Sequence, residues 1–95
     1  MPIPVALHSH LDANGRITKL PVKLSKKTAL AMGLLEEFHA GRDYTESEVN
    51  EILYAFVDDF ALIRRTLVER GELGREKDCS RYWRIPATPE AQVAD

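Results

Sequence analysis

Cysteine is almost absent from this chain, and long apolar runs and export signals are missing. Cys79 is the single cysteine among 95 residues, so no internal disulfide can form. No apolar run approaches the roughly 20 residues that span a bilayer. The opening MPIPVALHSHLD lacks the basic and long apolar regions of a signal peptide. We therefore expect a protein of the reducing cytoplasm with no membrane partner.

Catalytic and metal-binding motifs are also missing. The sequence contains no CxxC, no HExxH, no Gly-rich phosphate loop and no nucleophile elbow. His8 and His10 alternate and could bind zinc with His39 or Cys79, but two histidines alone are a weak signal. Cys79 lies near a polar turn, where an incidental surface thiol is a more ordinary explanation than a redox sensor. We expect neither an enzyme nor a cofactor.

Charge of one sign does not dominate. The net charge of −2 is not that of a typical nucleic-acid binder. The charges are nevertheless segregated, since residues 16–27 carry +5, residues 36–59 carry −7 and residues 64–84 carry +3. The folded chain should therefore have basic and acidic faces. Such faces suit DNA, and they also suit an acidic or basic protein partner.

Helical periodicity begins after Pro21. Segment 26–40 carries an apolar stripe, with Ser25 as its expected N-cap and Gly41 as its stop. In the next helix, Thr45 and Glu48 fit the capping box S/T-x-x-E and precede apolar residues at i, i+3, i+4 and i+7. This second helix is the clearest local signal in the sequence.

The C-terminal half predicts one more helix and a hairpin. The third helix is expected to start at Asp58 or Asp59 and to run to about Arg70. Two short strands, 72–76 and 81–85, follow it, joined by the turn KDCS. The two last helices are separated by very few residues, as a helix-turn-helix requires.

The N-terminal region is less regular. The first ten residues are expected to form an arm or an irregular strand. Asn14-Gly15 is a strong hairpin-turn signal, because both residues tolerate a positive φ. Leu11 and Ile17 can flank that turn as short strands.

The whole pattern predicts an α+β fold, a winged helix-turn-helix. It would have three helices, a C-terminal two-stranded β-wing and a short N-terminal hairpin or arm. The expected division is an arm over 1–10, the winged-helix domain over 11–86 and a flexible tail over 87–95, with a short strand near 42–44. The apolar residues expected in the core are Leu30, Leu34, Leu35, Phe38, Val49, Ile52, Leu53, Phe56, Phe60, Ile63, Leu67 and Leu73.

Several separate motifs resemble one bacterial family. ITKLP, YTESEVNEIL, DDFALIRRTLVERGELGRE and SRYWR, between Leu11 and Arg84, are similar in order and spacing to the domain of unknown function 2087 family. The resemblance implies a link to transcription, because members occur alone or attached to helix-turn-helix regulators, but it brings no established activity or site. The family usually has Asp-Gly-Ser at the wing turn. This chain has Asp78-Cys79-Ser80, which leaves open the geometry of a turn that suits glycine.

Two adjacent arginines lie in the third helix. At 100° per residue, Arg64 borders the buried face and Arg65 faces solvent. We expect Arg64 to pack along the core edge and to pair with an acid. The candidate acids are Glu48, Glu51 and Asp59. Two interpretations of Arg65 remain open, namely a contact with DNA and a solvated pair with Glu69.

The wing alternates basic and aromatic residues. Arg75, Lys77 and Arg81 are candidate phosphate contacts, because basic residues interleaved with aromatics suit the DNA backbone and minor groove. The alternative for the aromatics is that one of Tyr82 and Trp83 covers the core and the other covers the third helix, and we favour this structural role for Trp83. A second basic patch precedes and opens the first helix, and it can join the wing in contacting phosphates. Its members are Lys19, Lys23, Lys26 and Lys27, each of which alone is more simply explained as solvated.

The leading functional interpretation is a module that binds double-stranded DNA or accompanies transcription. The acids Asp58 and Asp59 at the start of the third helix, and Glu46, Glu48 and Glu51 in the second, would repel phosphates. The alternative is therefore a non-catalytic module for protein interaction or dimerisation, with a protein partner or a homodimer.

Overall fold

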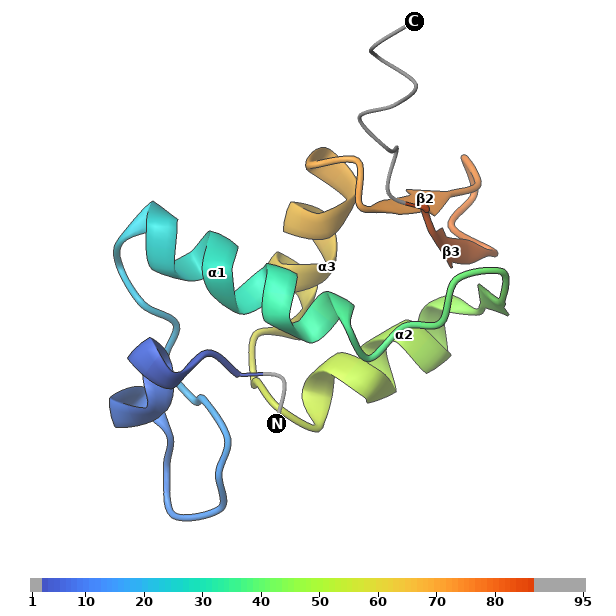
Figure 1. The fold of residues 1–95 in the computed structure, drawn as a ribbon. Coiled ribbons are helices and arrows are strands. Elements are labelled where there is room, and N and C mark those ends of the chain that lie inside the picture. Colours follow the sequence, from blue (N-terminus) through green and yellow to red (C-terminus); the bar gives the residue numbers. More distant parts are fainter. Residues whose placement is uncertain (1–2, 87–95) are drawn as a thin grey trace, which may run out of the picture.

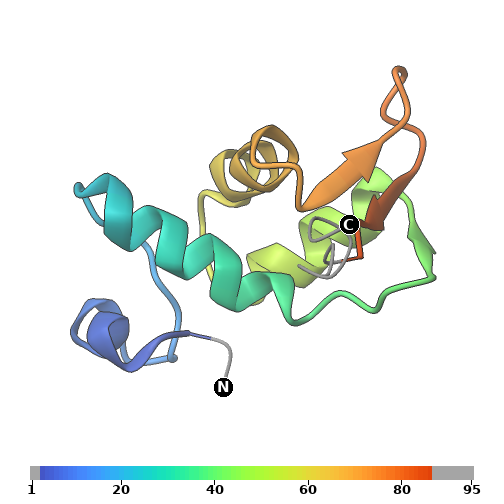
Figure 2. The same ribbon diagram turned by 45° about the horizontal axis from the view of Figure 1, so that its top comes forward.

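The structure, a computed structural model, describes residues 3–86 as three α-helices, one 3-10 helix and a small antiparallel sheet (Figure 1). In chain order the elements are η1 (Val5–His10), α1 (Leu24–Leu35), β1 (Asp43–Tyr44), α2 (Glu46–Tyr54), α3 (Phe60–Glu69), β2 (Leu73–Arg75) and β3 (Tyr82–Arg84). Both views show the β2–β3 hairpin and η1 at opposite ends of the helices (Figure 2). The expected α+β class is confirmed. No helix between residues 3 and 86 is long and apolar enough to cross a membrane.

Local capping signals start α2 and α3 as predicted. The backbone N–H of Thr45 donates to Glu48 Oε1 at 2.8 Å, and the N–H of Glu48 donates to Thr45 Oγ1 at 3.1 Å, which completes the capping box. Asp59 Oδ1 accepts from the N–H of Leu62 at 3.3 Å and caps α3. Gly71, with a φ of 77°, follows α3 and redirects the chain into β2.

Helix α1 starts earlier and ends earlier than predicted. It begins at Leu24, so Ser25 lies inside the helix and the prediction that it is the N-cap is wrong. It ends at Leu35, so the prediction that Gly41 stops the helix is wrong. The carbonyls of residues 33–35 accept the N–H groups of residues 36–38 at 3.3, 3.0 and 3.0 Å, which closes the helix in a tighter turn. Arg84 of β3 adds a tertiary contact there, because its Nη1 donates to the carbonyls of Leu35 at 3.4 Å and Phe38 at 3.0 Å.

The sheet has the strand order β1-β3-β2 with both pairs antiparallel. The two predicted C-terminal strands are confirmed as β2 and β3, and the short strand predicted near 42–44 is confirmed as β1. We call the β2–β3 hairpin the wing. Tyr44 and Arg75 both lie opposite Tyr82, so these three residues share the face toward the helices. Trp83 lies on the other face, where a Cβ on Gly74 would overlap its ring. Of the two aromatics considered for the core, Tyr82, 2% exposed, therefore covers it and Trp83 does not.

The first described residues pack against the helices. Val5–His10 form a 3-10 helix where an arm or an irregular strand was expected. Ile3 and Leu7 are 2% and 1% exposed, so this apolar opening belongs to the core. His8 Nε2 lies 3.0 Å from the carbonyl oxygen of Ile3, and residues 3–86 contain no group of three acids, histidines or cysteines arranged for a metal ion. The tail expected over 87–95 lies outside the described residues.

The predicted turn at Asn14-Gly15 forms, with a φ of 76° at the glycine, but no hairpin strands flank it. Ile17 instead forms a parallel bridge with Val57, in the connection between α2 and α3. The N-terminal segment is thereby tied to the connection between α2 and α3 rather than to itself.

The predicted core is largely confirmed. Nine of its twelve residues are buried, and Ile52, Phe56 and Phe60 are partly buried against them. The buried residues outside that list are Ile3, Leu7, Ile17, Ala31, Tyr44, Val57 and Tyr82. Apart from Ala31, these lie in short segments where periodicity gives no signal.

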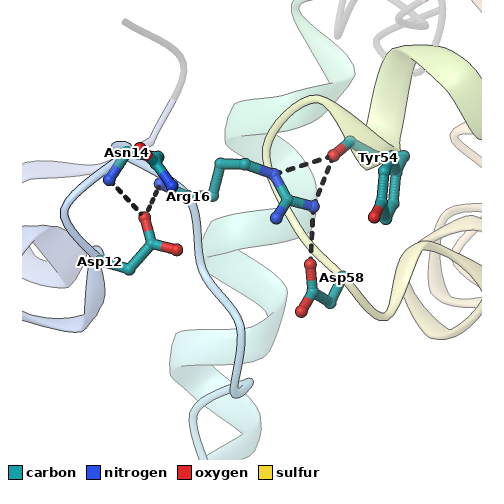
Figure 3. Close-up of polar contacts among 5 residues, drawn as sticks. All are labelled: Asp12, Asn14, Arg16, Tyr54 and Asp58. Atoms are coloured by element: carbon teal, nitrogen blue, oxygen red, sulfur yellow. Dashed lines mark hydrogen bonds and ion pairs between the residues drawn. The ribbon is translucent and has the colours of Figure 1, made fainter.

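Arg16 fastens the N-terminal segment to the end of α2 (Figure 3). Its Nε and Nη2 donate to the carbonyl of Tyr54 at 3.2 and 2.8 Å, and Nη2 lies 2.7 Å from Asp58 Oδ1. Asp12 Oδ1 accepts from the N–H groups of Asn14 and Arg16, which shapes the turn before it. Because Tyr54 ends α2, its carbonyl lacks a helical partner, and Arg16 supplies one.

We expect Arg16→Met to lower the free energy of unfolding by about 2 kcal/mol, because it removes charge-assisted hydrogen bonds and keeps the alkyl stem. Urea unfolding followed by circular dichroism measures the change. Lys19→Met is the control, because Lys19 is exposed and forms no ion pair within residues 3–86. A loss no larger than that of the control would contradict the role of Arg16.

Candidate functional site

The arginines fall into two groups. Those that form ion pairs are Arg16, Arg42, Arg81 and Arg84. Those that form none within residues 3–86 are Arg64, Arg65, Arg70 and Arg75. The second group lies entirely in the segment that runs from α3 into β2. Uncompensated guanidinium charge is thus concentrated in one part of the fold.

A hollow of about 390 Å³ lies between α3, the wing and the start of α2. The residues that line it are Glu46, Arg64, Arg65, Val68, Glu69, Arg75, Cys79 and Tyr82. Two predicted nucleic-acid contacts from different elements, Arg65 and Arg75, therefore meet at one site. We call this site the wing hollow.

Arg64 lies at the back of the wing hollow and is half-buried, as its place on the helical wheel predicted. Its partner is not one of the acids expected from the sequence. Arg64 Nη1 donates to the side-chain oxygen of Asn50 on α2, and the prediction of an acidic partner is wrong. Two of the three expected acids are engaged elsewhere, since Glu48 completes the capping box and Asp59 caps α3.

The other two arginines that line the wing hollow are more exposed to solvent than Arg64. Arg65 is exposed and, within the described residues, forms neither an ion pair with Glu69 nor any other side-chain hydrogen bond. Arg75 is exposed, and its Nη1 lies 3.1 Å from Cys79 Sγ and 3.4 Å from the carbonyl oxygen of Glu76. Both guanidinium groups can therefore turn toward a ligand without breaking an ion pair.

The remaining wing candidates differ from one another. Lys77 is exposed in the turn and forms no ion pair in the part of the chain that the structure describes. Arg81 lies 3.0 Å from Asp43 Oδ2 and 2.5 Å from Glu76 Oε2, and its guanidinium stacks 4.7 Å from the Trp83 ring centroid. Hydrogen bonds to Glu76 and Asp43 raise the pKa of Arg81. A phosphate contact by Arg81 would have to compete with two carboxylates.

The basic N-terminal patch lies apart from the wing. Lys23 precedes α1, and Lys26 and Lys27 lie in its first turn, at the end of the helix away from β2 and β3 in both views (Figures 1 and 2). Val22 and Leu24, on either side of Lys23, are 87% and 76% exposed. The structure therefore does not bring the two predicted basic surfaces together, and it adds two exposed apolar side chains to the first.

Tyr82 forms the floor of the wing hollow, a role that strand alternation alone could not assign. Its hydroxyl donates to Glu46 Oε2 at 2.9 Å. Burial, and then the hydrogen bond to the Glu46 carboxylate, raise the pKa of Tyr82 above its usual value of 10.0. The bond joins the wing to the first turn of α2.

Above about pH 10, an unfolded tyrosine loses its proton while folded Tyr82 keeps it, so stability should fall with rising pH. The contribution of this group is at most about 1.4 kcal/mol per pH unit. Tyr82→Phe should lose this part of the decrease in unfolding free energy with rising pH. Tyr54→Phe, at a tyrosine that is 53% exposed, should keep it. Urea unfolding between about pH 9 and 11 tests this, and identical slopes for wild type and Tyr82→Phe would refute it.

The wing turn keeps a left-handed residue although it has no glycine. Cys79 has a φ of 63°. We expect Cys79→Gly to be more stable than Cys79→Ala by about 1 kcal/mol, because both lack the thiol and alanine alone must adopt the left-handed conformation. Urea unfolding compares the two variants. The same pair of substitutions at Ser80, where φ is not positive, should show no advantage for glycine. Equal stabilities at position 79 would argue against the left-handed turn.

The chain is similar to a known protein family over most of its length. A family model described as "Uncharacterized protein conserved in bacteria (DUF2087)" matches residues 16–84. The match covers the segment from Arg16 through β3 and so includes every residue that lines the wing hollow. Neither the curated proteins nor the solved structures contain a match to this chain. Because the family model covers more than two thirds of the 95 residues, the chain belongs to the bacterial DUF2087 family.

Proposed function

We propose that the chain is a winged helix-turn-helix module that binds double-stranded DNA with α3 and the wing. The element order α1-β1-α2-α3-β2-β3 and the sheet order β1-β3-β2 support this assignment. A short connection, residues 55–59, joins α2 to α3, as in a helix-turn-helix. In this arrangement α3 would enter the major groove, and the β2–β3 hairpin would follow the adjacent backbone.

The concentration of unpaired arginines carries the proposal. Arg65 on α3 and Arg75 on β2 lie around one hollow, and Lys77 lies at the tip of the same hairpin. Arginine binds phosphate oxygens through a planar pair of N–H donors, whereas lysine contributes a point charge. We propose that these three side chains contact the DNA backbone, with Arg65 closest to the groove.

The acids that argued against DNA binding are partly compensated. Asp58 pairs with Arg16, and Glu48 pairs with Arg42 at 3.4 Å while it also accepts the N–H of Thr45. Their negative charge is therefore partly offset before DNA approaches. The net charge of −2 understates the attraction that the α3–wing face can exert.

Association with transcription follows from the resemblance to a family whose members occur attached to helix-turn-helix regulators. We propose a non-catalytic, cytoplasmic component of such a system. Lys23, Lys26 and Lys27 would then contact backbone phosphates at a separate place from the wing, because they open α1 at the far end of the helices.

One observation favours the alternative, a protein-interaction or dimerisation module. Val22 and Leu24 are strongly exposed and neighbour each other around the start of α1. Apolar side chains surrounded by lysines suit an acidic protein surface better than a sugar–phosphate backbone. The acidic α2 of a second copy is one such surface.

We expect the protein to bind a labelled random-sequence duplex in fluorescence anisotropy, with a steep loss of affinity between about 50 and 200 mM salt. Each phosphate contact contributes about 0.9 to the slope of log affinity against log salt, so Arg75→Gln and Lys77→Gln should each lower it by about that amount. Arg65→Gln should weaken binding as well. Arg81→Gln should change the slope less, because its guanidinium already has two carboxylate partners.

Arg42→Gln is the matched control, because it removes the same charge from a side chain already paired with Glu48. An equal loss in Arg42→Gln and Arg75→Gln would mean that net charge alone governs binding. No binding at low salt would reject the DNA proposal. A concentration-dependent rise in mass by light scattering, abolished by Val22→Ser/Leu24→Ser, would then support the alternative.

A further inference from the structure

We propose that the wing hollow is a discrete binding site for one phosphate group, with Arg65 and Arg75 as direct ligands and Arg64 as a fixed charge behind them. The inference deepens the proposed DNA binding and rests on it only where the phosphate is that of a DNA backbone. The same chemistry would accept a free phosphate or a small phosphorylated molecule.

The charge at the back of the hollow is unusual. Arg64 is half-buried, yet its partner is the neutral side-chain oxygen of Asn50. A guanidinium in such a place normally has a carboxylate partner, because removing it from water is unfavourable otherwise. An oxyanion bound in the hollow would supply the missing negative charge.

The carboxylates of the hollow do not cancel this charge. Glu46 keeps its negative charge and accepts the Tyr82 hydroxyl at Oε2 at 2.9 Å, but it forms no ion pair with an arginine within residues 3–86. Glu69 forms no ion pair with Arg65 in the part of the chain that the structure describes. The residues that line the hollow include three arginines and two glutamates, so its net charge is positive.

Arg75 is held in place by a weak acceptor. Its Nη1 lies 3.1 Å from Cys79 Sγ, and thiol sulfur accepts hydrogen bonds poorly. Exchanging that contact for a phosphate oxygen gives a stronger, charge-assisted bond and breaks no ion pair. Arg75 is therefore positioned beside the hollow and free to close on a ligand.

The size and the walls of the hollow limit the ligand. About 390 Å³ is near the lower end of pockets that hold small molecules, enough for a phosphate with a small substituent. Val68 and the Tyr82 ring supply apolar wall beside the arginines. These features suit a phosphate monoester or diester better than a bare halide.

The first experiment titrates inorganic phosphate into the ¹⁵N-labelled full chain at constant ionic strength and follows the arginine Nε–Hε signals by NMR. We expect saturable chemical-shift changes at Arg65 and Arg75. In Arg75→Gln we expect a dissociation constant for phosphate that is at least about tenfold larger, which corresponds to the loss of one charge-assisted hydrogen bond. Arg70→Gln is the control, because Arg70 is exposed, lacks an ion pair within residues 3–86 and does not line the hollow. Arg65→Gln provides a second variant at an exposed position. Backbone spectra verify that each variant is folded.

A second titration, with the DNA duplex added to the phosphate-bound protein, distinguishes a DNA backbone phosphate from a free phosphate or a small phosphorylated molecule. If DNA displaces phosphate from Arg65 and Arg75, the site takes a backbone phosphate. If phosphate saturates the site while the duplex does not bind, the site stands and the DNA proposal fails. Linear, unsaturable shifts spread over exposed arginines, unchanged by Arg75→Gln, would overturn the site even if the duplex binds elsewhere.

Discussion

Tyr82, a residue of β3, is buried on the inner face of the wing, and its burial determines how the sheet and the helices are joined. Strands of two and three residues make a sheet that is marginal by itself. Tyr82 is 2% exposed, and its hydroxyl reaches Glu46 at the start of α2, so the wing is fastened to the helices by packing and by a hydrogen bond. Tyr44 shares this face, and its ring meets Phe38 edge-on at 5.2 Å between centroids. The wing hollow exists because these contacts hold the hairpin beside α3.

Arginine has two different roles in this small domain. Arg16 donates to the carbonyl of Tyr54 at the end of α2, and Arg84 donates to the carbonyl of Leu35 at the end of α1, which also accepts the N–H of Phe38. The arginines between α3 and β2 have no acidic partner in the described structure. A count of charges cannot separate these roles, because it depends on which acids the fold brings close. The net charge is therefore a poor guide to the surface that a partner meets.

The molecule presents two basic surfaces of different character. The wing hollow is concave and rich in arginine, and its apolar wall comes from Val68 and Tyr82. The start of α1 carries lysines around the exposed Val22 and Leu24. The first suits a phosphate held in a fixed geometry, and the second suits a looser contact with phosphates or with an acidic protein. Both uses are compatible within one module, since the two surfaces lie at opposite ends of the helices.

Local chemistry in the sequence was sufficient for several elements. The capping box of Thr45 and Glu48, the cap at Asp59 and the apolar stripes of the helices depend on neighbours within one or two turns, so they could be recognised without the fold. The strands of the wing and the exposure of Arg65 follow from the same short-range rules. Family membership also came from the sequence, as motifs in a fixed order.

Contacts between distant segments decided the rest. Arg84 reached the carbonyls at and after the end of α1, Ile17 paired with Val57 rather than within a hairpin, and the Asn50 side chain became the partner of Arg64. The meeting of Arg65 and Arg75 depended likewise on the angle at which the wing returns to α3. Sequence patterns report short-range preferences, whereas each of these outcomes depends on which groups are left without partners once the core has packed.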